Sequence, residues 1–198
     1  KLKGIPLVFD FQGSLRAEML DHGFISPHDP LEAIFEALEK LVNRLPARII
    51  TSSEHSRSVL IDDFGVRPEM VVEVADRVDA TAFQPRRSNE GRAARIRSGL
   101  KIPENTLVVG YLGLLAGYQG TTHLLEAASA VLQEFSACHF LIMGYPGAST
   151  YRALADRMGI GSRVTFTGRI PYPEAPAYLS VLDVAVSPKL SETEGNGK

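Results

Sequence analysis

The stretch Thr106–Phe135 constrains the fold more than any other part of the chain; it reads TLVVGYLGLLAGYQGTTHLLEAASAVLQEF. Its first part, Thr106–Leu112, is a short apolar run with valines, which is typical of a strand buried on both faces. A glycine-bounded loop, Gly113–Gly120, follows, and from Thr121 onward apolar residues recur at the spacing of one helix face. The stretch therefore predicts a strand, a glycine loop and a helix, which is half of a parallel βαβ unit.

This half-unit is also suited to binding an anion. A loop that leads into a helix places backbone N–H groups at the helix N-terminus, where negative charge is favoured. An ordinary strand-to-helix turn in a parallel sheet would show the same glycines, however. The pattern alone leaves both interpretations open.

The rest of the chain repeats the alternation of strand and helix patterns. Other apolar strand-like runs are Ile5–Phe11, Ala47–Thr51, Met70–Val74, His139–Met143, Val164–Thr167 and Val184–Ser187. Helical spacing of apolar residues separates them, so the fold class is α/β with Rossmann-like parallel sheets. The segment Ala75–Glu90 interrupts the alternation, because it is rich in Asp, Arg, Pro, Ser and Asn. It is the best candidate for a linker between two partial domains.

Composition and cysteine content narrow the function classes. Apolar residues make up 44% of the chain, charged residues 22%, and the formal net charge is −2. This is ordinary globular composition without a basic stripe, so we expect no nucleic-acid partner. Cys138 is the only cysteine. It cannot form an internal disulfide and lies beside an apolar run, which predicts a core position and a reducing, cytoplasmic location.

The familiar enzyme motifs are absent from the sequence. There is no GxxxxGK[ST] loop and no GxSxG elbow, and the five histidines lack the spacing of zinc ligands. What remains are three turns that follow strands in the second half: Gly113–Gly120, Gly168–Pro171 and Ser187–Lys198. If the strands are parallel neighbours, these turns converge on one edge of the sheet and form a cleft. The last turn carries Glu192 and Glu194, which a solvated loop would explain equally well.

Several segments together resemble the group 1 glycosyltransferases. The segments GYLGLLAGYQGTTHLLEAASAVLQEFSACHFLIMG and VTFTGRIPYPEAPAYLSVLDVAVSP are similar to the donor-binding domain of that family, and EGNGK, from Glu194, resembles the loop that opens its paired-glutamate motif. Upstream, ARIITSSEHSRSVLIDDFGVRPEMVVEVADRVDATAFQP resembles the crossing from acceptor to donor domain. The resemblance implies a GT-B architecture with two partial domains. Residues 1–83 would be the C-terminal part of the acceptor domain, and residues 84–198 the first part of the nucleotide-sugar domain.

The resemblance also implies roles for individual residues. Glu194, with Glu192 as the rival because the loop register is uncertain, would be the carboxylate beside the donor sugar. Gly113 and the amides of Gly195, Asn196 and Gly197 would approach the diphosphate, and Ile170 would read the base through main-chain atoms. The family usually carries an arginine and a lysine on the first turn to hold the diphosphate. This chain has Leu114 and Gln119 there, so Arg169 is a candidate for the missing charge.

The implied function is transfer of a sugar from a nucleotide-diphosphate sugar to a carbohydrate or lipid-linked acceptor, with retention and without a metal. The resemblance is also compatible with peripheral contact between the full-length enzyme and a membrane. The chain starts at Lys1 and stops at Lys198 in a polar loop, so we expect a piece of a longer protein that is inactive alone. A GT-B-type sugar-nucleotide epimerase and a non-catalytic nucleotide-sugar binding module remain as alternatives.

Overall fold

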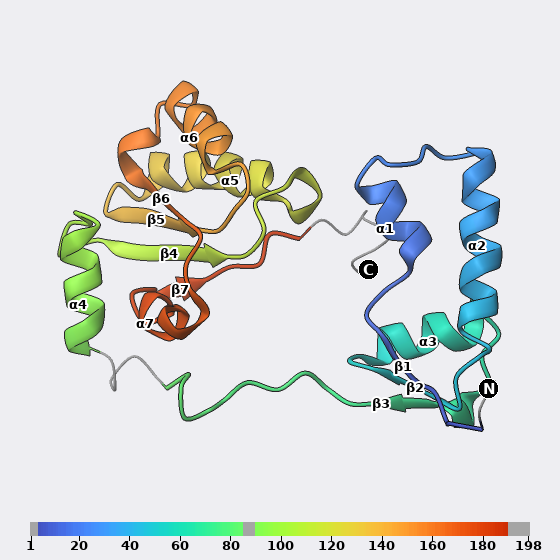
Figure 1. Ribbon diagram of the computed structural model, residues 1–198. Helices are drawn as coiled ribbons and strands as arrows, with labels where there is room; N and C mark the ends of the chain where they lie inside the picture. The colour runs from blue at the N-terminus through green and yellow to red at the C-terminus, as the bar shows by residue number, and fades with distance from the viewer. Residues whose placement is uncertain (1–3, 85–89, 190–198) are drawn as a thin grey trace. The chain divides into compact units, whose positions relative to one another are not determined.

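The computed structural model describes residues 4–84 and 90–189, and these divide into two compact units (Figure 1). The first unit comprises described residues up to Arg77, and the second begins at Val78. The division falls inside the predicted linker segment, residues 75–90. The assignment of residues 1–83 and 84–198 to acceptor and donor domains stays a prediction. Each unit is described by itself below.

The second unit is built on a four-stranded parallel sheet. Its strands are β4 (Leu107–Leu112), β5 (Cys138–Met143), β6 (Val164–Gly168) and β7 (Val184–Ala185), in the order β6-β5-β4-β7. Strands β4 and β5 pair in parallel with Leu107 opposite Cys138, which confirms the predicted crossover. The intervening helix forces this arrangement, because it returns the chain to the end of the sheet where it started.

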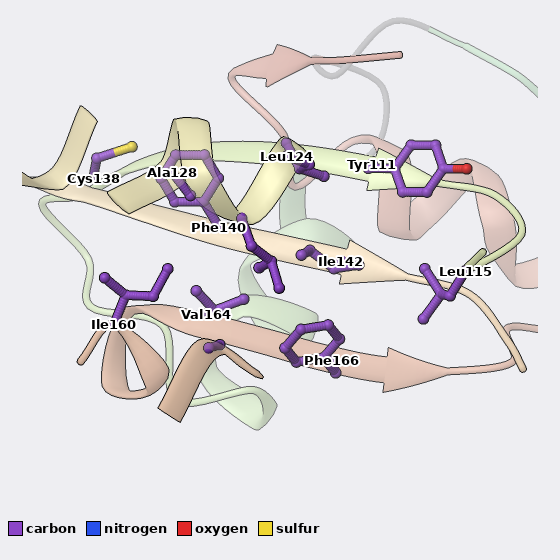
Figure 2. Packing of buried hydrophobic residues seen from close by; sticks show 12 residues of the cluster. Tyr111, Leu115, Leu124, Ala128, Cys138, Phe140, Ile142, Ile160, Val164 and Phe166 are labelled. Carbon is purple, nitrogen blue, oxygen red and sulfur yellow. The ribbon is translucent and has the colours of Figure 1, made fainter. Parts of the chain in front are cut away.

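Helices cover both faces of this sheet. Helices α5 (Thr121–Glu134) and α6 (Ala148–Arg157) lie on one face, and α4 (Glu90–Gly99) and α7 (Ala175–Leu179) lie on the other (Figure 1). Alternate residues of β5 point to opposite faces: Phe140 and Ile142 join the α5–α6 core (Figure 2). Leu141 belongs to the cluster on the α4–α7 side. All six residues of β5 are buried, as its continuous apolar pattern predicts.

Two potentially reactive side chains of β5 belong to this core. Cys138 is buried, which confirms the core position predicted for it, and burial raises the pKa of its thiol. His139 is 4% exposed, and its Nε2 lies 2.8 Å from the Thr165 hydroxyl. Burial lowers the pKa of His139 to about 4, so the ring is neutral near pH 7. Neither residue lies at a strand end where a ligand would bind.

The first unit has a smaller parallel sheet. Its strands are β1 (Val8–Phe11), β2 (Arg48–Thr51) and β3 (Val71–Glu73), paired in that order. Its helices are α1 (Leu15–Asp21), α2 (Pro30–Val42) and α3 (Glu54–Asp62). Helix α3 buries Leu60 against the face of the sheet that carries Phe11, Ile49 and Val71. The opposite face carries Val8 and Val72, which are 55% and 44% exposed.

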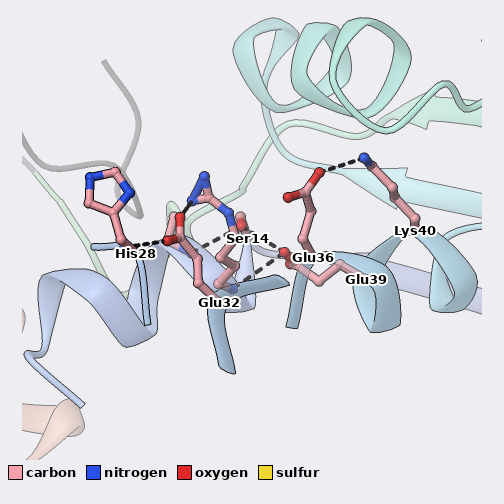
Figure 3. A network of polar contacts seen from close by, with 8 residues as sticks. Ser14, His28, Glu32, Glu36, Glu39 and Lys40 are labelled. Atoms are coloured by element: carbon pink, nitrogen blue, oxygen red, sulfur yellow. Dashed lines mark hydrogen bonds and ion pairs between the residues drawn. The ribbon is translucent and has the colours of Figure 1, made fainter. Parts of the chain in front are cut away.

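Helix α2 buries a different face from the one that its apolar residues define. Its apolar stripe is largely exposed: Leu31, Ile34, Leu38 and Leu41 are each about half accessible. The buried residue of α2 is Glu39, whose carboxylate accepts hydrogen bonds from the Ser14 hydroxyl at 2.9 Å and from the Leu15 N–H at 2.5 Å (Figure 3). Glu39 therefore caps the N-terminus of α1, where negative charge is favoured.

Candidate functional site

The candidate site lies where the strand order of the second sheet reverses. From β4 the chain proceeds to β5 and then β6 on one side, and afterwards returns to place β7 on the other side of β4. The strand order therefore reverses at β4. In open α/β sheets such a switch point leaves a crevice outside the carboxyl ends of the strands, and ligands bind there.

Glycines allow the backbone segments at this edge to approach closely. Gly120 has φ of 76°, and a Cβ atom there would overlap the carbonyl oxygen of Pro188, which follows β7. Gly144, which follows β5, lies in the same way against the carbonyl of Gly113, and the Gly113 N–H donates to the Met143 carbonyl at 3.0 Å. The turns after β4, β5 and β7 are thus packed together, and those after β4 and β7 are two of the three turns that the sequence predicted to converge.

The N-terminus of α5 opens on this edge. Its N-cap is Gly120, so no side chain caps the helix. Thr121 is fully buried and turns its hydroxyl back to the Ala116 carbonyl at 3.2 Å. The first N–H groups of a helix lack carbonyl partners within the helix, and the helix dipole adds partial positive charge there. The start of α5 can therefore bind an oxyanion without any cationic side chain.

The two side chains singled out on the first turn, Leu114 and Gln119, contribute no charge. Leu114 is 39% exposed, and its carbonyl accepts a hydrogen bond from the Tyr111 hydroxyl at 2.9 Å. Gln119 is half-buried at the end of the short 3₁₀ turn Gly117–Gln119, immediately before Gly120. The tyrosine bond fixes the shape of the turn, and the glutamine offers only neutral hydrogen bonds.

Arg169 brings a positive charge to the same edge from the next turn. Its guanidinium carbon lies 5.2 Å from the ring centroid of Tyr145, so the turns after β6 and β5 meet through a cation–π contact. Tyr145 is half exposed. Ile170 is half-buried and packs toward the cluster that α4 and α7 cover. Of Arg169 and Ile170, only Arg169 has a charged side chain that can stabilise an anion.

Lys189 is a cation that the sequence analysis did not single out. It directly follows Pro188, whose carbonyl lies against Gly120, and its side chain is exposed. It therefore sits at the switch point, next to the turn where Gln119 replaces the expected lysine. The only sequence signal was its place just after the last strand, because the contact between Gly120 and Pro188 is tertiary.

The remaining predicted site residues cannot be placed. Glu192, Glu194 and the loop residues Gly195, Asn196 and Gly197 lie outside the described residues. Across residues 4–84 and 90–189, no three His, Cys, Asp or Glu side chains gather in a way that could hold a metal ion. In the same part of the chain, no helix is long and apolar enough to span a bilayer.

The carboxyl edge of the first unit is also polar. Gln12, which follows β1, donates its amide to the Asp10 carboxylate at 2.7 Å. Glu73 ends β3 near Glu54, and a hydrogen bond between these two carboxyl groups raises the pKa of Glu73. The Thr51 hydroxyl at the end of β2 is buried and has no partner among the described residues. Gln12, Asp10 and Glu73 therefore give this edge amide and carboxyl groups of the kind that bind a polyhydroxylated ligand.

An apolar hollow in the second unit is not the candidate donor site. It has a volume of about 790 Å³, lies among Leu107, Val131, Phe135 and Val184, and is mainly apolar. It opens at the amino ends of β4 and β5, at the opposite end of the strands from the switch point. Its charged lining residues are one arginine, Arg97, and three acidic residues, Glu104, Glu134 and Asp183, so it does not suit a phosphorylated ligand.

Sequence comparison with known proteins assigns the chain to one family. The family model described as Glycosyl transferases group 1 matches residues 93–197. A 2-deoxystreptamine glucosyltransferase of Streptomyces kanamyceticus is 29% identical over 161 residues, which cover 80% of this chain and 41% of that protein. A D-inositol 3-phosphate glycosyltransferase of Thermobifida fusca is 26% identical over 97% of this chain and 45% of its own length. The chain thus spans less than half of the length of each of these relatives.

Solved structures share the fold. The lipopolysaccharide glycosyltransferase WaaG superimposes with a TM-score of 0.73 at 14% identity, over 96% of this chain and 52% of its own. Anabaena Alr3699/HepE, solved in complex with UDP, superimposes with a TM-score of 0.69 at 22% identity, over 92% of this chain and 46% of its own. These neighbours are GT-B glycosyltransferases, which confirms the predicted fold class.

Proposed function

This chain belongs to the group 1 glycosyltransferase family, and from that premise we propose that the whole protein transfers a sugar from a nucleotide-diphosphate sugar to an acceptor. The observation that carries the proposal is the switch point, where Gly120 and Pro188 pack together and α5 begins without a side-chain cap. A diphosphate is the part of such a donor that this arrangement would bind best.

Individual residues then have distinct tasks. The first N–H groups of α5 bind the diphosphate, and Arg169 and Lys189 supply the positive charge that Leu114 and Gln119 lack. Main-chain atoms at Ile170 contact the base. The amides of Gly195, Asn196 and Gly197 are further donors for the diphosphate.

The chemical step would depend on a carboxylate outside the described residues. Glu194, or Glu192 in the alternative register, accepts hydrogen bonds from the donor sugar and stabilises positive charge developing at the anomeric carbon. We propose transfer with retention and without a metal ion. The acceptor is a carbohydrate or a lipid-linked molecule, and the enzyme acts in the cytoplasm with peripheral membrane contact.

Product analysis of the full-length protein tests the proposed reaction. Incubation with labelled nucleotide-diphosphate sugars and candidate acceptors should give a glycosylated acceptor that keeps the donor's anomeric configuration. An inverted sugar nucleotide would indicate an epimerase, and unchanged donor with measurable binding would indicate a binding module. Glu194→Gln should reduce turnover far more than Glu192→Gln. The reverse order would move the carboxylate to position 192.

A glycine pair tests the location of the donor site. Gly120→Ala places a Cβ against the Pro188 carbonyl and a non-glycine residue at positive φ, whereas a Cβ at Gly117 meets nothing within 4 Å. Gly120→Ala should weaken UDP binding at least tenfold in a protein that is still folded by circular dichroism. Gly117→Ala should change it little. Equal affinities in all three proteins would place the nucleotide elsewhere.

A further inference from the structure

A polar hollow in the first unit is not part of the site described above. It has a volume of about 490 Å³ and lies between the end of α2, the start of β2 and the turn after α3. Arg48 is the first residue of β2, and Met70 directly precedes β3, so the hollow is at the amino ends of these strands. Substrates of α/β sheets bind at the opposite edge, so this hollow is not the acceptor's reaction site.

Positive side chains dominate the lining. Arg44, Arg48 and Arg67 all line the hollow, and none of its lining residues is acidic. Arg67 does pair with Glu69 at 3.5 Å, but both side chains are about two-thirds or more exposed, so the pair contributes little. Arg48 donates one guanidinium N–H to the Ala47 carbonyl at 2.8 Å and keeps its other donors available.

A buried amide lies at the same place. Asn43 is the C-cap residue of α2, is 2% exposed and lines the hollow. The lining of the hollow therefore contains a side-chain amide in addition to the arginines. The N–H₂ group of this amide can donate two hydrogen bonds, which adds to the donors that the arginines supply.

We propose that this hollow binds a phosphate group. Three guanidinium groups and an amide N–H₂ are all donors, and guanidinium groups match the geometry of phosphate oxygens better than any other side chain. The C-terminal end of α2 disfavours an anion, so the arginines must provide the attraction. The phosphate can belong to a small phosphorylated metabolite or to a phospholipid headgroup, which share this chemistry.

The experiment uses the full-length protein and two probes. Calorimetric titration with inorganic phosphate measures binding of a soluble phosphate. Co-sedimentation with phosphatidylcholine vesicles, with or without phosphatidic acid, measures binding to a lipid headgroup.

Three substitutions remove the positive charges one at a time. Arg44→Gln, Arg48→Gln and Arg67→Gln should each weaken binding roughly threefold to tenfold, and added salt should weaken it further. Asn43→Asp, which puts a carboxylate into the hollow, should abolish it. Arg77→Gln, an exposed arginine of the same unit, is the control and should bind like wild type.

The possible outcomes distinguish a small phosphorylated ligand, a lipid headgroup and the absence of a phosphate site. Binding of inorganic phosphate without vesicle binding supports a small phosphorylated ligand, and binding only to vesicles that contain phosphatidic acid supports a headgroup. Absence of both, or an equal loss in Arg77→Gln, overturns the proposal. Phosphate binding that Gly120→Ala removes and the arginine variants keep would belong to the switch point and would also overturn it. This test does not depend on sugar transfer.

Discussion

The two units follow the same alternation of strand and helix, yet they cover their sheets differently. In the second unit every residue of β5 is buried between two layers of helices. In the first unit one face packs on α3, while Val8 and Val72 on the other face are exposed, as is the apolar stripe of α2. A parallel sheet is stable when both faces are covered. The second unit therefore has a complete core within the described residues, and the first unit has half of one.

A matched pair of leucines tests this difference most strongly. Leu125 of α5 is fully buried, whereas Leu38 of α2 is 48% exposed. In this 198-residue chain, Leu125→Ala should lower the free energy of unfolding of the second unit by about 3 kcal/mol, because it leaves a cavity. Leu38→Ala should cost less than about 1 kcal/mol. Urea denaturation measures both, and equal costs would show that the α2 stripe is buried after all.

The buried histidine of the second unit should make that unit sensitive to acid. The pKa of His139 is lowered from 6.5 to about 4 in the folded state, so the unfolded state binds the proton more tightly. Stability is then unaffected by this group above pH 6.5 and falls as the pH drops from 6.5 to 4, by about 3 kcal/mol at most.

Urea unfolding of the second unit at pH 7 and pH 4.5 checks this slope. His139→Gln should flatten it, whereas His55→Gln, an exposed position of the first unit, should keep it. A slope that survives in His139→Gln would assign the acid sensitivity to other groups.

A smaller effect is expected in the first unit from the carboxylate of Glu39. Glu39→Gln keeps the size of the side chain but removes the charge that accepts from Ser14, Leu15 and the Arg16 N–H. We expect a loss of about 1–2 kcal/mol and faster amide exchange in α1. Glu36→Gln, on the same helix and paired at the surface with Lys40, is the control and should change little. Unchanged exchange in α1 would contradict the capping role.

The smallest effect concerns the switch point of the second unit. Gln119→Lys in the full-length protein restores the family's cation beside the α5 N-terminus. One charge-assisted hydrogen bond should tighten UDP binding on the order of tenfold, which is about 1.4 kcal/mol, with greater salt sensitivity than wild type. Calorimetry compares the two proteins. Equal dissociation constants at low salt would mean that residue 119 does not reach the diphosphate and would leave Arg169 and Lys189 as the cations.

The sequence predicted the second unit better than the first for a physical reason. Strands buried on both faces and helices with one apolar face leave a periodic pattern, and in the second unit burial follows that pattern. In α2 the pattern identified the helix, but not which side is buried. That choice depends on Ser14 and α1, which contact Glu39 across more than twenty residues of chain.

The sequence by itself determined the order of strands and helices, the parallel crossover between β4 and β5 and the core position of Cys138, because short-range spacing encodes these features. Only the tertiary structure decided that Gly120 meets Pro188, that Arg169 stacks on Tyr145 and that Lys189 stands at the switch point. These residues are neighbours because the strand order reverses at β4. That reversal depends on how the whole sheet packs and leaves no local mark on the chain.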